Sequence, residues 1–260
     1  CPVEATLRLQ ILSDLHLSGG APPIPATDAD LFVLAGDIAR PGEALAWAAG
    51  LGKPVLYVPG NHEFYGSSID ATLRDLRVLS AGTNVRVLDD DELVVDGVRF
   101  LGSTLWTDFM VCGDGEIRSA AMADARRFVR DFSRIRAADG NGAPFTPDDA
   151  VARHARHAAW IESRLAKPHD GPTVVVGDLN AVPDSPVVAA LVTGGLSDAV
   201  PGGAPGTNHG FTGRTDGRRI DHILVSRHWA IDDARVHITR PGGRLPSDHW
   251  PVTADLVLGV

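Results

Sequence analysis

Polar residues of the metal-binding type follow three apolar runs in the first quarter of the chain. The run LRLQIL leads into SDLH, LFVLA into GDI and VLYV into PGNHE, and these polar stretches contain Asp14, His16, Asp37, Asn61 and His62. Each run has the length and apolar character of a strand that is covered on both faces. Because the carboxyl ends of such strands line the ligand crevice of an open α/β sheet, we expect the five residues to meet at one edge.

The residue types in this set suit divalent metal ions. Asp14 and His16 are two positions apart on what we expect to be an extended segment, so both side chains could chelate one ion. Asp37 follows a glycine that permits close backbone approach, and it could bridge two ions. Asn61 offers a carbonyl oxygen, and His62 could accept or donate a proton. Such mixed ligands suit Mn, Fe, Zn or similar ions, and two ions could clamp both ends of a phosphoryl displacement.

A second polar set lies in the last third of the chain. Asp178 and Asn180 stand two positions apart at the end of the run TVVVGDLN, and Asp248 and His249 precede another apolar run. A carboxylate near a histidine fixes the tautomer of the ring and raises its basicity, which general acid–base catalysis requires. Taken singly, Asp178 could instead cap the following turn and Asp248 could cap a strand end. As a set, these residues indicate a catalytic origin.

The elements that must position these residues alternate between strand and helix. Apolar residues at helical spacing follow the second and third early runs, which predicts a largely parallel sheet with right-handed crossovers. Asp96 and Gly97 form a tight-turn signal between two later strands, so the sheet becomes mixed. Thr146 and Pro147 supply the start signals of a long helix. The expected strands are 7–12, 29–35, 54–58, two or three within 85–106, 173–177, 219–225, 234–239 and 251–258, and the expected helices are 42–52, 67–82, 115–137, 146–166 and 185–195.

The composition describes a folded chain with an acidic balance. Of 260 residues, 44% are hydrophobic, which supports a substantial buried core, and the formal net charge is −9. Neither part of the chain is basic, so binding of nucleic acid is possible but not favoured. A small phosphorylated substrate fits better, and a local stripe of Arg214, Arg218 and Arg219 could hold its phosphate.

We expect neither a membrane span nor a secretion signal in this sequence. No apolar stretch approaches the roughly 20 residues that a membrane helix needs, and the first residues lack the basic flank and cleavage site of a signal peptide. We therefore expect a cytoplasmic protein without membrane contact. Cys1 and Cys112 are too few for a disulfide framework, and we interpret both as bystanders. No pattern in the sequence indicates an oligomeric state.

Three further groups of polar residues favour a structural interpretation. The run DDDE at 89–92 is interpreted as a solvated turn, because four adjacent like charges cannot all face inward. His154 and His157 fall within an expected helix, away from the strand ends, so we do not expect them to be ligands. The arginines between 126 and 136 recur around a helix and are interpreted as a solvated face.

The motifs DLH, GDI and GNHE stand in the order and spacing of the first three motifs of the calcineurin-like metallophosphoesterases, which this part of the chain resembles. The resemblance implies that Asp14, His16, Asp37 and Asn61 are metal ligands. It also implies that His62 binds phosphate or protonates the leaving group. That family continues with a strand that ends in two histidines and with a Gly-His-x-His element, and this sequence has neither. The expected strand is present as TVVV, but GDLN follows it.

The motifs GDLNAVPDSP, NHGFTGR, RRIDHILVS and LPSDHWPV resemble, in order, the C-terminal part of the endonuclease/exonuclease/phosphatase family, which includes abasic-site nucleases and sphingomyelinases. The resemblance implies that Asp178 and Asn180 position the nucleophilic water and the scissile phosphate. It implies that Asp221 orients His249, which would contact or protonate the phosphate, and that Asp248 is a metal ligand. That family also needs an early asparagine and a metal-binding glutamate, and the strands that carry them are absent here.

The two resemblances together describe a chimera-like chain. The first covers residues from about 7 to 172 and the second from about 173 to 260, with an apparent junction near 167–176. Both families have a layered α/β/β/α sandwich with mixed sheets, so the resemblance implies an α/β fold and a single compact domain over residues 1–260. A helix followed by an apolar strand is common to both, so one buried strand can replace the other.

Three functions follow from this reading of the sequence. The leading hypothesis is a phosphoesterase that depends on one or two divalent ions (Mn, Fe, Zn or Mg) and hydrolyses a phosphomonoester or phosphodiester by metal-activated water. The first alternative is a folded chimera with two incomplete half-sites and little or no catalysis. The second alternative is a magnesium-dependent nuclease of the second family. Proximity of the Asp37 and Asp178 carboxylates would favour one joint site over two orphan half-sites.

Overall fold

The computed structural model describes most of the chain. The described residues are 6–17, 28–110, 113–140, 142–179, 181–200, 202–210, 212–238, 245, 247 and 249–258. Two residues expected in the site, Asn180 and Asp248, lie outside the described residues, as do Cys1 and Cys112. Among the described helices, none combines the length and the apolar character needed to cross a membrane.

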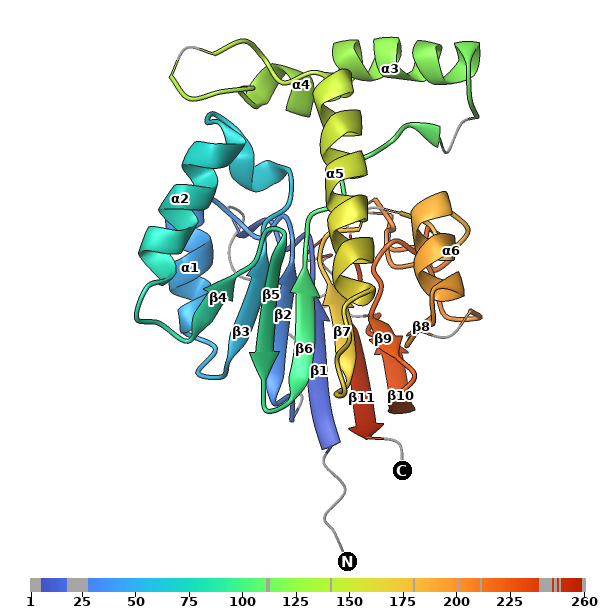
Figure 1. The fold of residues 1–260 in the computed structure, drawn as a ribbon. Coiled ribbons are helices and arrows are strands. Elements are labelled where there is room, and N and C mark those ends of the chain that lie inside the picture. Colours follow the sequence, from blue (N-terminus) through green and yellow to red (C-terminus); the bar gives the residue numbers. More distant parts are fainter. Residues whose placement is uncertain are drawn as a thin grey trace, which may run out of the picture.

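Six strands form the first sheet, in the order β10-β11-β1-β2-β3-β4 (Figure 1). Their bounds are β1 Thr6–Leu12, β2 Leu31–Ala35, β3 Val55–Val58, β4 Val85–Val87, β10 Trp229–Val236 and β11 Val252–Leu258. Strands β1 to β4 pair in parallel, whereas β11 is antiparallel to both β1 and β10. The central parallel strands β2 and β3 are apolar and buried throughout, as expected for strands that are covered on both faces. The predicted mixed sheet with parallel strands is confirmed, but β10 and β11 make this sheet mixed, whereas the strands on either side of the Asp96–Gly97 turn lie in the other sheet.

Five strands form the second sheet, in the order β5-β6-β7-β9-β8. Their bounds are β5 Asp91–Val95, β6 Val98–Gly102, β7 Thr173–Val176, β8 Leu196–Asp198 and β9 Leu224–Ser226. The turn between β5 and β6 is the predicted one, with φ of 49° at Asp96 and 80° at Gly97. Strand β7 lies at the centre of the sheet, parallel to β6 and antiparallel to β9. Strand β7 therefore pairs with one strand from before the junction expected near 167–176 and with one from after it.

Helices cover the outer faces of the two sheets, except α3 and α4, which lie beyond one end of the strands (Figure 1). Their bounds are α1 Pro41–Ala49, α2 Ile69–Ser80, α3 Glu116–Phe128, α4 Asp131–Arg134, α5 Pro147–Leu165 and α6 Pro186–Thr193, with a short 3₁₀ helix, η2, at His62–Phe64. The start of α5 is the predicted one. Thr146 accepts a hydrogen bond from the Asp149 N–H, and the Asp149 carboxylate accepts one from the Thr146 N–H.

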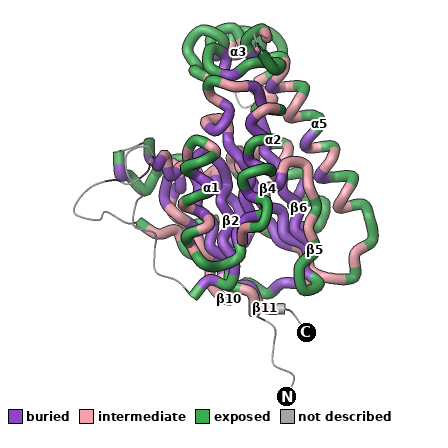
Figure 2. Tube along the Cα trace, turned by 90° about the vertical axis from the view of Figure 1, so that its left-hand side faces the viewer, coloured by how far each residue is buried: buried purple, intermediate pink, exposed green. Residues whose placement is uncertain are grey.

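Three buried apolar layers hold the sandwich together, and Figure 2 shows that buried residues gather in the strands. Leu34, Tyr57 and Leu76 belong to the layer between the first sheet and helices α1 and α2. A second layer lies between the two sheets and includes Val33 from the first sheet and Val174 from the second. A third joins the second sheet to α5 and α6. The fold is thus the expected α/β/β/α sandwich in a single compact domain.

The structure differs from the sequence predictions in a few elements. The helix expected over 115–137 is divided into α3 and α4, and strand β8 was not predicted. The run DDDE is not simply a solvated turn, because β5 begins at Asp91. Asp90 accepts a hydrogen bond from Ser103 at 2.8 Å, and burial together with Asp90 raises the pKa of Asp89 to about 6. Tertiary contacts of this kind leave no local pattern in a sequence.

Candidate active site

Glu63 anchors the loops that follow β2 and β3. Its carboxylate is 1% exposed and accepts five hydrogen bonds of 2.6 to 3.2 Å. The donors are the backbone N–H groups of Asp37, Ile38, Ala39 and Gly60 and the hydroxyl of Tyr57. A buried carboxylate with this many donors is well satisfied, so we infer a structural role for Glu63.

The loops after β1 and β2 are held in strained backbone conformations. Asp14, His16 and Asp37 have φ of 51°, 46° and 56°, in the left-handed region that non-glycine residues rarely adopt. The extended segment expected for Asp14 and His16 is therefore wrong, because β1 ends at Leu12. The loops pair with each other instead: Asp14 N–H donates to Gly36 O at 3.0 Å and His16 N–H to Asp37 O at 3.1 Å.

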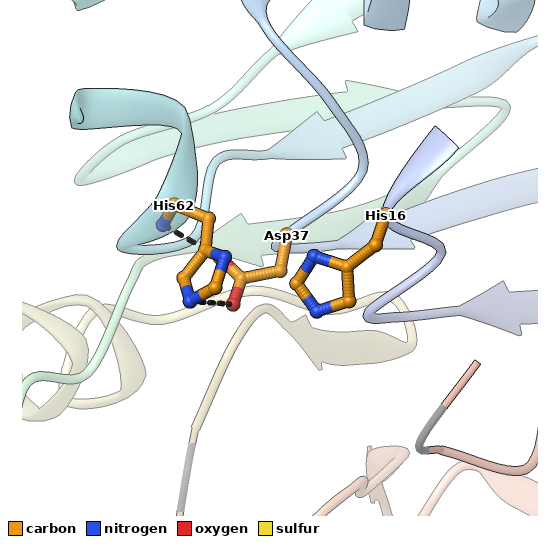
Figure 3. Close-up of side chains that lie close together, drawn as sticks. All are labelled: His16, Asp37 and His62. Carbon is orange, nitrogen blue, oxygen red and sulfur yellow. Dashed lines mark hydrogen bonds and ion pairs between the residues drawn. The ribbon is translucent and has the colours of Figure 1, made fainter. Parts of the chain in front are cut away.

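His16, Asp37 and His62 form the first triad of candidate ligands (Figure 3). One ligand atom of each residue lies within 4.8 Å of the other two, and Asp37 lies between the two imidazoles. The His62 backbone N–H donates to Asp37 Oδ1 at 2.8 Å, and His62 Nε2 lies 3.8 Å from Asp37 Oδ2. The His62 side chain is 42% exposed and that of Asp37 only 8%. Solvent can therefore reach a space lined by one carboxylate and two imidazoles.

Asp14, Asp221 and His249 form the second triad. His249 Nδ1 lies 2.9 Å from Asp221 Oδ2 and 3.1 Å from Asp14 Oδ2, and Asn208 Nδ2 lies 2.7 Å from His249 Nε2. Because a carboxylate only accepts, Nδ1 carries a proton, and Nε2 accepts from the Asn208 amide. Burial alone would raise the pKa of Asp221, but His249 and a hydrogen bond from Ser13 outweigh it and lower that pKa to about 2. The second triad is thus a carboxylate–histidine unit of fixed tautomer.

Asp14 links the two triads through its two carboxylate oxygens. Oδ1 lies 3.9 Å from His16 Nε2, in the first triad, and Oδ2 faces His249 in the second. Ser247 holds the two strand ends together, because its hydroxyl donates to the Asp14 carbonyl oxygen and accepts from the His249 N–H at 2.9 Å. Asp14 and His16 therefore lie close together, as predicted, although they belong to different triads.

Asp178 brings the end of β7 against the loop after β2. A β-carbon placed on Gly36 would lie only 2.8 Å from the Asp178 carboxylate oxygen Oδ2, so a side chain at position 36 would collide with it. Burial, followed by the neighbouring Asp221, raises the pKa of Asp178 to about 8. Burial, Glu63 and Asp178 raise the pKa of Asp37 well above its ordinary value. Asp37 and Asp178, which are 141 positions apart in the sequence, thus bring the two residue sets together in one crevice.

The residues of this crevice fit a divalent cation. Burial and neighbouring carboxylates raise the pKa values of Asp37 and Asp178. A cation bound beside these carboxyl groups would stabilise their ionised forms. The first triad supplies carboxylate and imidazole ligands, and such mixed sets suit Mn, Fe or Zn. Its open geometry leaves the ring nitrogens of His16 and His62 facing the space beside Asp37.

Two cavities adjoin the crevice. The smaller, of about 260 Å³, is lined by Asn61, Asp131 and Asp178 together with residues 104–107. The larger, of about 560 Å³, shares Trp106 with the smaller one and reaches Asn208, the hydrogen-bond partner of His249. A volume of this size is ordinary for a small-molecule site. The larger cavity therefore offers room for a substrate group next to the second triad.

His154 and His157 hold one wall of the cavities rather than any ligand set of the crevice. His154 Nδ1 contacts the carbonyl oxygen of Trp106, and His157 Nδ1 lies 2.6 Å from that of Thr104. Burial lowers the pKa of His157, which keeps its ring neutral. Both histidines of α5 thus position the segment between β6 and α3.

Eight of the ten residues expected in the site are described, and they gather at one edge of the sandwich. They are Asp14, His16, Asp37, Asn61, His62, Asp178, Asp221 and His249. Sequence reasoning missed the partners that hold them. Ser13, Asn208 and Ser247 lie inside the same motifs, where a hydroxyl or amide beside a charged residue could have been noticed. No sequence motif indicated Asp131, which accepts a hydrogen bond from Asn61.

The family model of the endonuclease/exonuclease/phosphatase family matches residues 21–249, and the chain belongs to this family. Members of the family are hydrolases that include phosphatases and nucleases. The match crosses the junction expected near 167–176. The comparisons give no support for a calcineurin-like N-terminal part or for a chimera, and both stay predictions.

Three solved structures illustrate the likeness. A functionally unknown conserved protein from Enterococcus faecalis V583 is 30% identical over 41% of this chain and 45% of its own, with a TM-score of 0.34. The Bacteroides thetaiotaomicron mannosyl-6-phosphatase Bt3783 is 26% identical over 39% and 45%, with a TM-score of 0.32. The endonuclease/exonuclease/phosphatase from Bacteroides vulgatus is 15% identical over 98% and 100%, with a TM-score of 0.45. The chain thus spans less than half the length of the first two, and no curated protein matches it.

Proposed function

We propose that the protein is a divalent-metal-dependent phosphoesterase whose site combines both residue sets. The observation that carries this proposal is the Asp178 carboxylate packed against Gly36, directly beside Asp37. The first triad, with Asp14 at its border, would hold one or two ions of Mn, Fe, Zn or Mg. A bound divalent ion lowers the pKa of water and stabilises charge on a phosphoryl group.

Asp178 and His249 would move the protons of the reaction. As the oxygen of water forms a bond to phosphorus, its proton would pass to the Asp178 carboxylate, which would be ionised once a bound cation offsets the neighbouring negative charge that raises its pKa. The bond between phosphorus and the leaving oxygen breaks in line, and that oxygen would take a proton from His249 Nε2. This nitrogen carries a proton only in the cationic ring, in which the Asn208 amide would turn its oxygen towards it. Asp221 stabilises the cationic ring that holds this proton beforehand. His62, which solvent reaches, would contact the phosphate.

The substrate would be a phosphoester of modest size. The larger cavity places apolar side chains such as Leu179 and Val187 beside Asn208, and its charged lining includes two carboxylates, Asp108 and Asp184, and the guanidinium of Arg218. Such a lining accepts an uncharged alcohol group better than a polyanion. A small phosphomonoester or phosphodiester fits this cavity better than a long nucleic acid does.

Hydrolysis of aryl phosphates tests the proposal. Protein freed of metal by chelation should be inactive on p-nitrophenyl phosphate and bis-p-nitrophenyl phosphate and should gain activity with Mn²⁺. Asp178→Asn should lower kcat at least about 100-fold, because the amide cannot take the proton from water. If Asp37→Asn and Asp178→Asn both kept full metal-dependent activity, the proposal would be wrong. A strong preference for abasic DNA with Mg²⁺ would identify a nuclease instead.

A further inference from the structure

Asp131, in the short helix α4, contacts the edge of the candidate active site. Its Oδ1 accepts a hydrogen bond from the Asn61 amide at 2.9 Å and another from the Tyr65 hydroxyl at 2.6 Å. We propose that Asp131 is a positioning residue that fixes the Asn61 amide so that its carbonyl oxygen serves as a metal ligand. The inference rests on the proposed function, because it assigns a supporting residue to the same site.

The chemistry of the contact decides which end of the Asn61 amide faces Asp131. A carboxylate has no proton to donate, so it pairs with the NH₂ end of an amide. The carbonyl Oδ1 of Asn61 is therefore held at the opposite end, and Asn61 lines the same small cavity as Asp178. An oxygen is a ligand for divalent ions, whereas an amide NH₂ is not. A freely rotating amide would present the correct end only part of the time.

Tyr65 extends the same support to His62. The Tyr65 ring lies 4.5 Å from the His62 ring between centroids, and the His62 ring lies 4.7 Å from that of His16. The Tyr65 hydroxyl donates a hydrogen bond to Asp131. One carboxylate therefore holds both Asn61 and the ring that packs on His62. Groups that bind ligands rather than the metal commonly set ligand orientation in this way.

Helix α4 is itself rigidly attached beside the site. The Gly66 N–H donates to the Arg134 carbonyl at 2.7 Å, and the Arg136 N–H donates to the Ser67 carbonyl at 2.9 Å. Phe132, the neighbour of Asp131, is buried and stacks on Phe145 with 6.1 Å between ring centroids. The carboxylate is thus presented from a fixed backbone, as orientation of a ligand requires.

Mn²⁺ binding to three variants tests the proposal, with isothermal titration calorimetry as the readout. Asp131→Ala should weaken Mn²⁺ binding about tenfold, because loss of a ligand-orienting partner costs on the order of 10-fold to 100-fold. Asp131→Asn should stay within about threefold of the wild type, since its amide oxygen accepts the same two hydrogen bonds. Tyr65→Phe should also stay within about threefold. Equal affinities of Asp131→Ala and the wild type would overturn the proposal, and so would an Asp131→Asn variant as weak as Asp131→Ala.

A mutant cycle separates positioning from a general loss of structure. In an Asn61→Ala, Tyr65→Phe background, Asp131→Ala should have no further effect on Mn²⁺ affinity, because both groups that donate to its carboxylate are already gone. If Asp131→Ala weakened Mn²⁺ binding by the same factor in that background as in the wild type, Asp131 would act independently of Asn61 and Tyr65. That result would contradict the proposal. Thermal unfolding of each variant identifies any that fails to fold.

A metal-free readout keeps this inference separate from the proposed function. In the ¹⁵N-correlated NMR spectrum of the chelator-treated protein, the Asn61 side-chain NH₂ protons should exchange faster with water in Asp131→Ala than in the wild type. Asp131→Asn should leave that exchange nearly unchanged. If this pattern appears but no aryl phosphate is hydrolysed, the proposed function fails and the hydrogen bond stands. Unchanged exchange in Asp131→Ala, with hydrolysis present, overturns the inference alone.

Discussion

The two triads use the same residue types in different surroundings. In the first triad, His62 Nε2 is 3.8 Å from the Asp37 carboxylate, and the His62 side chain is 42% exposed. In the second, His249 Nδ1 is 2.9 Å from the Asp221 carboxylate, and the His249 side chain is 5% exposed. The first triad thus has an accessible space between its ligand atoms, whereas the second is already closed by hydrogen bonds.

This difference separates two chemical roles that residue types alone do not distinguish. An ion that enters the first triad gains ligands without breaking a short hydrogen bond between carboxylate and imidazole. An ion that enters the second would have to displace the proton on His249 Nδ1, which two carboxylates stabilise. We therefore assign metal binding to the first triad and proton transfer to the second, with Asp178 between them.

Asp37→Asn should have the largest effect on activity, because it removes the only carboxylate of the first triad. We expect hydrolysis of aryl phosphate at saturating Mn²⁺ to fall at least about 1,000-fold, from the combined loss of metal and of its charge stabilisation. Steady-state kinetics measure the effect. As a control, Asp96→Asn, in the turn between β5 and β6, should match the wild type, and a similar loss there would point to nonspecific damage.

His249→Ala should affect catalysis through the second triad. Removal of a general acid or base typically costs about 100-fold to 10,000-fold, and we expect kcat to fall by about 100-fold with KM little changed. The loss should be smaller for a p-nitrophenyl ester than for an alkyl ester, because nitrophenolate leaves without a proton. Equal losses on both esters would argue against proton donation by His249.

Glu63→Ala should act on the first triad through stability. It leaves four N–H groups and one hydroxyl without their buried acceptor, so we expect a loss of about 3 kcal/mol in the free energy of unfolding. Urea unfolding followed by circular dichroism measures it. Glu92→Ala, which removes a partly exposed ion pair with Arg164, should cost less than about 0.5 kcal/mol. If Glu63→Ala were as stable as the wild type, Glu63 would not anchor the loops after β2 and β3.

The metal-free protein should lose stability as pH rises towards 8. The Asp178 carboxyl has a pKa of about 8 in the folded protein and an ordinary value near 3.8 when unfolded. Between these values the folded state binds more protons than the unfolded state, so the free energy of unfolding falls with increasing pH. Thermal melts in EDTA from pH 5 to 8.5 should show this fall, and Asp178→Asn should reduce it. If stability fell equally steeply with pH in the wild type and in Asp178→Asn, the raised pKa of Asp178 would not be its cause.

The sequence predicted the layers of the fold because the relevant signals are local. Continuously apolar strands, the turn at Asp96 and Gly97 and the Thr146 cap each depend on neighbouring residues, and all three were found. Eight of the predicted site residues also lie near one another, since strand ends carry most of them, and their roles stay predictions. Their division into triads was not predicted, because it depends on left-handed loop residues and on contacts such as that between Ser13 and Asp221, 208 positions apart.

Mn²⁺ affinity of Asp37→Asn and His249→Ala, measured side by side by calorimetry at pH 7, tests the central assignment most directly. We expect Asp37→Asn to bind Mn²⁺ more than about tenfold more weakly than the wild type, because the first triad loses its charged ligand. We expect His249→Ala to bind within about threefold of the wild type, although its kcat is low. The reverse order, with His249→Ala losing the metal and Asp37→Asn keeping it, would contradict the assignment of metal binding to the first triad.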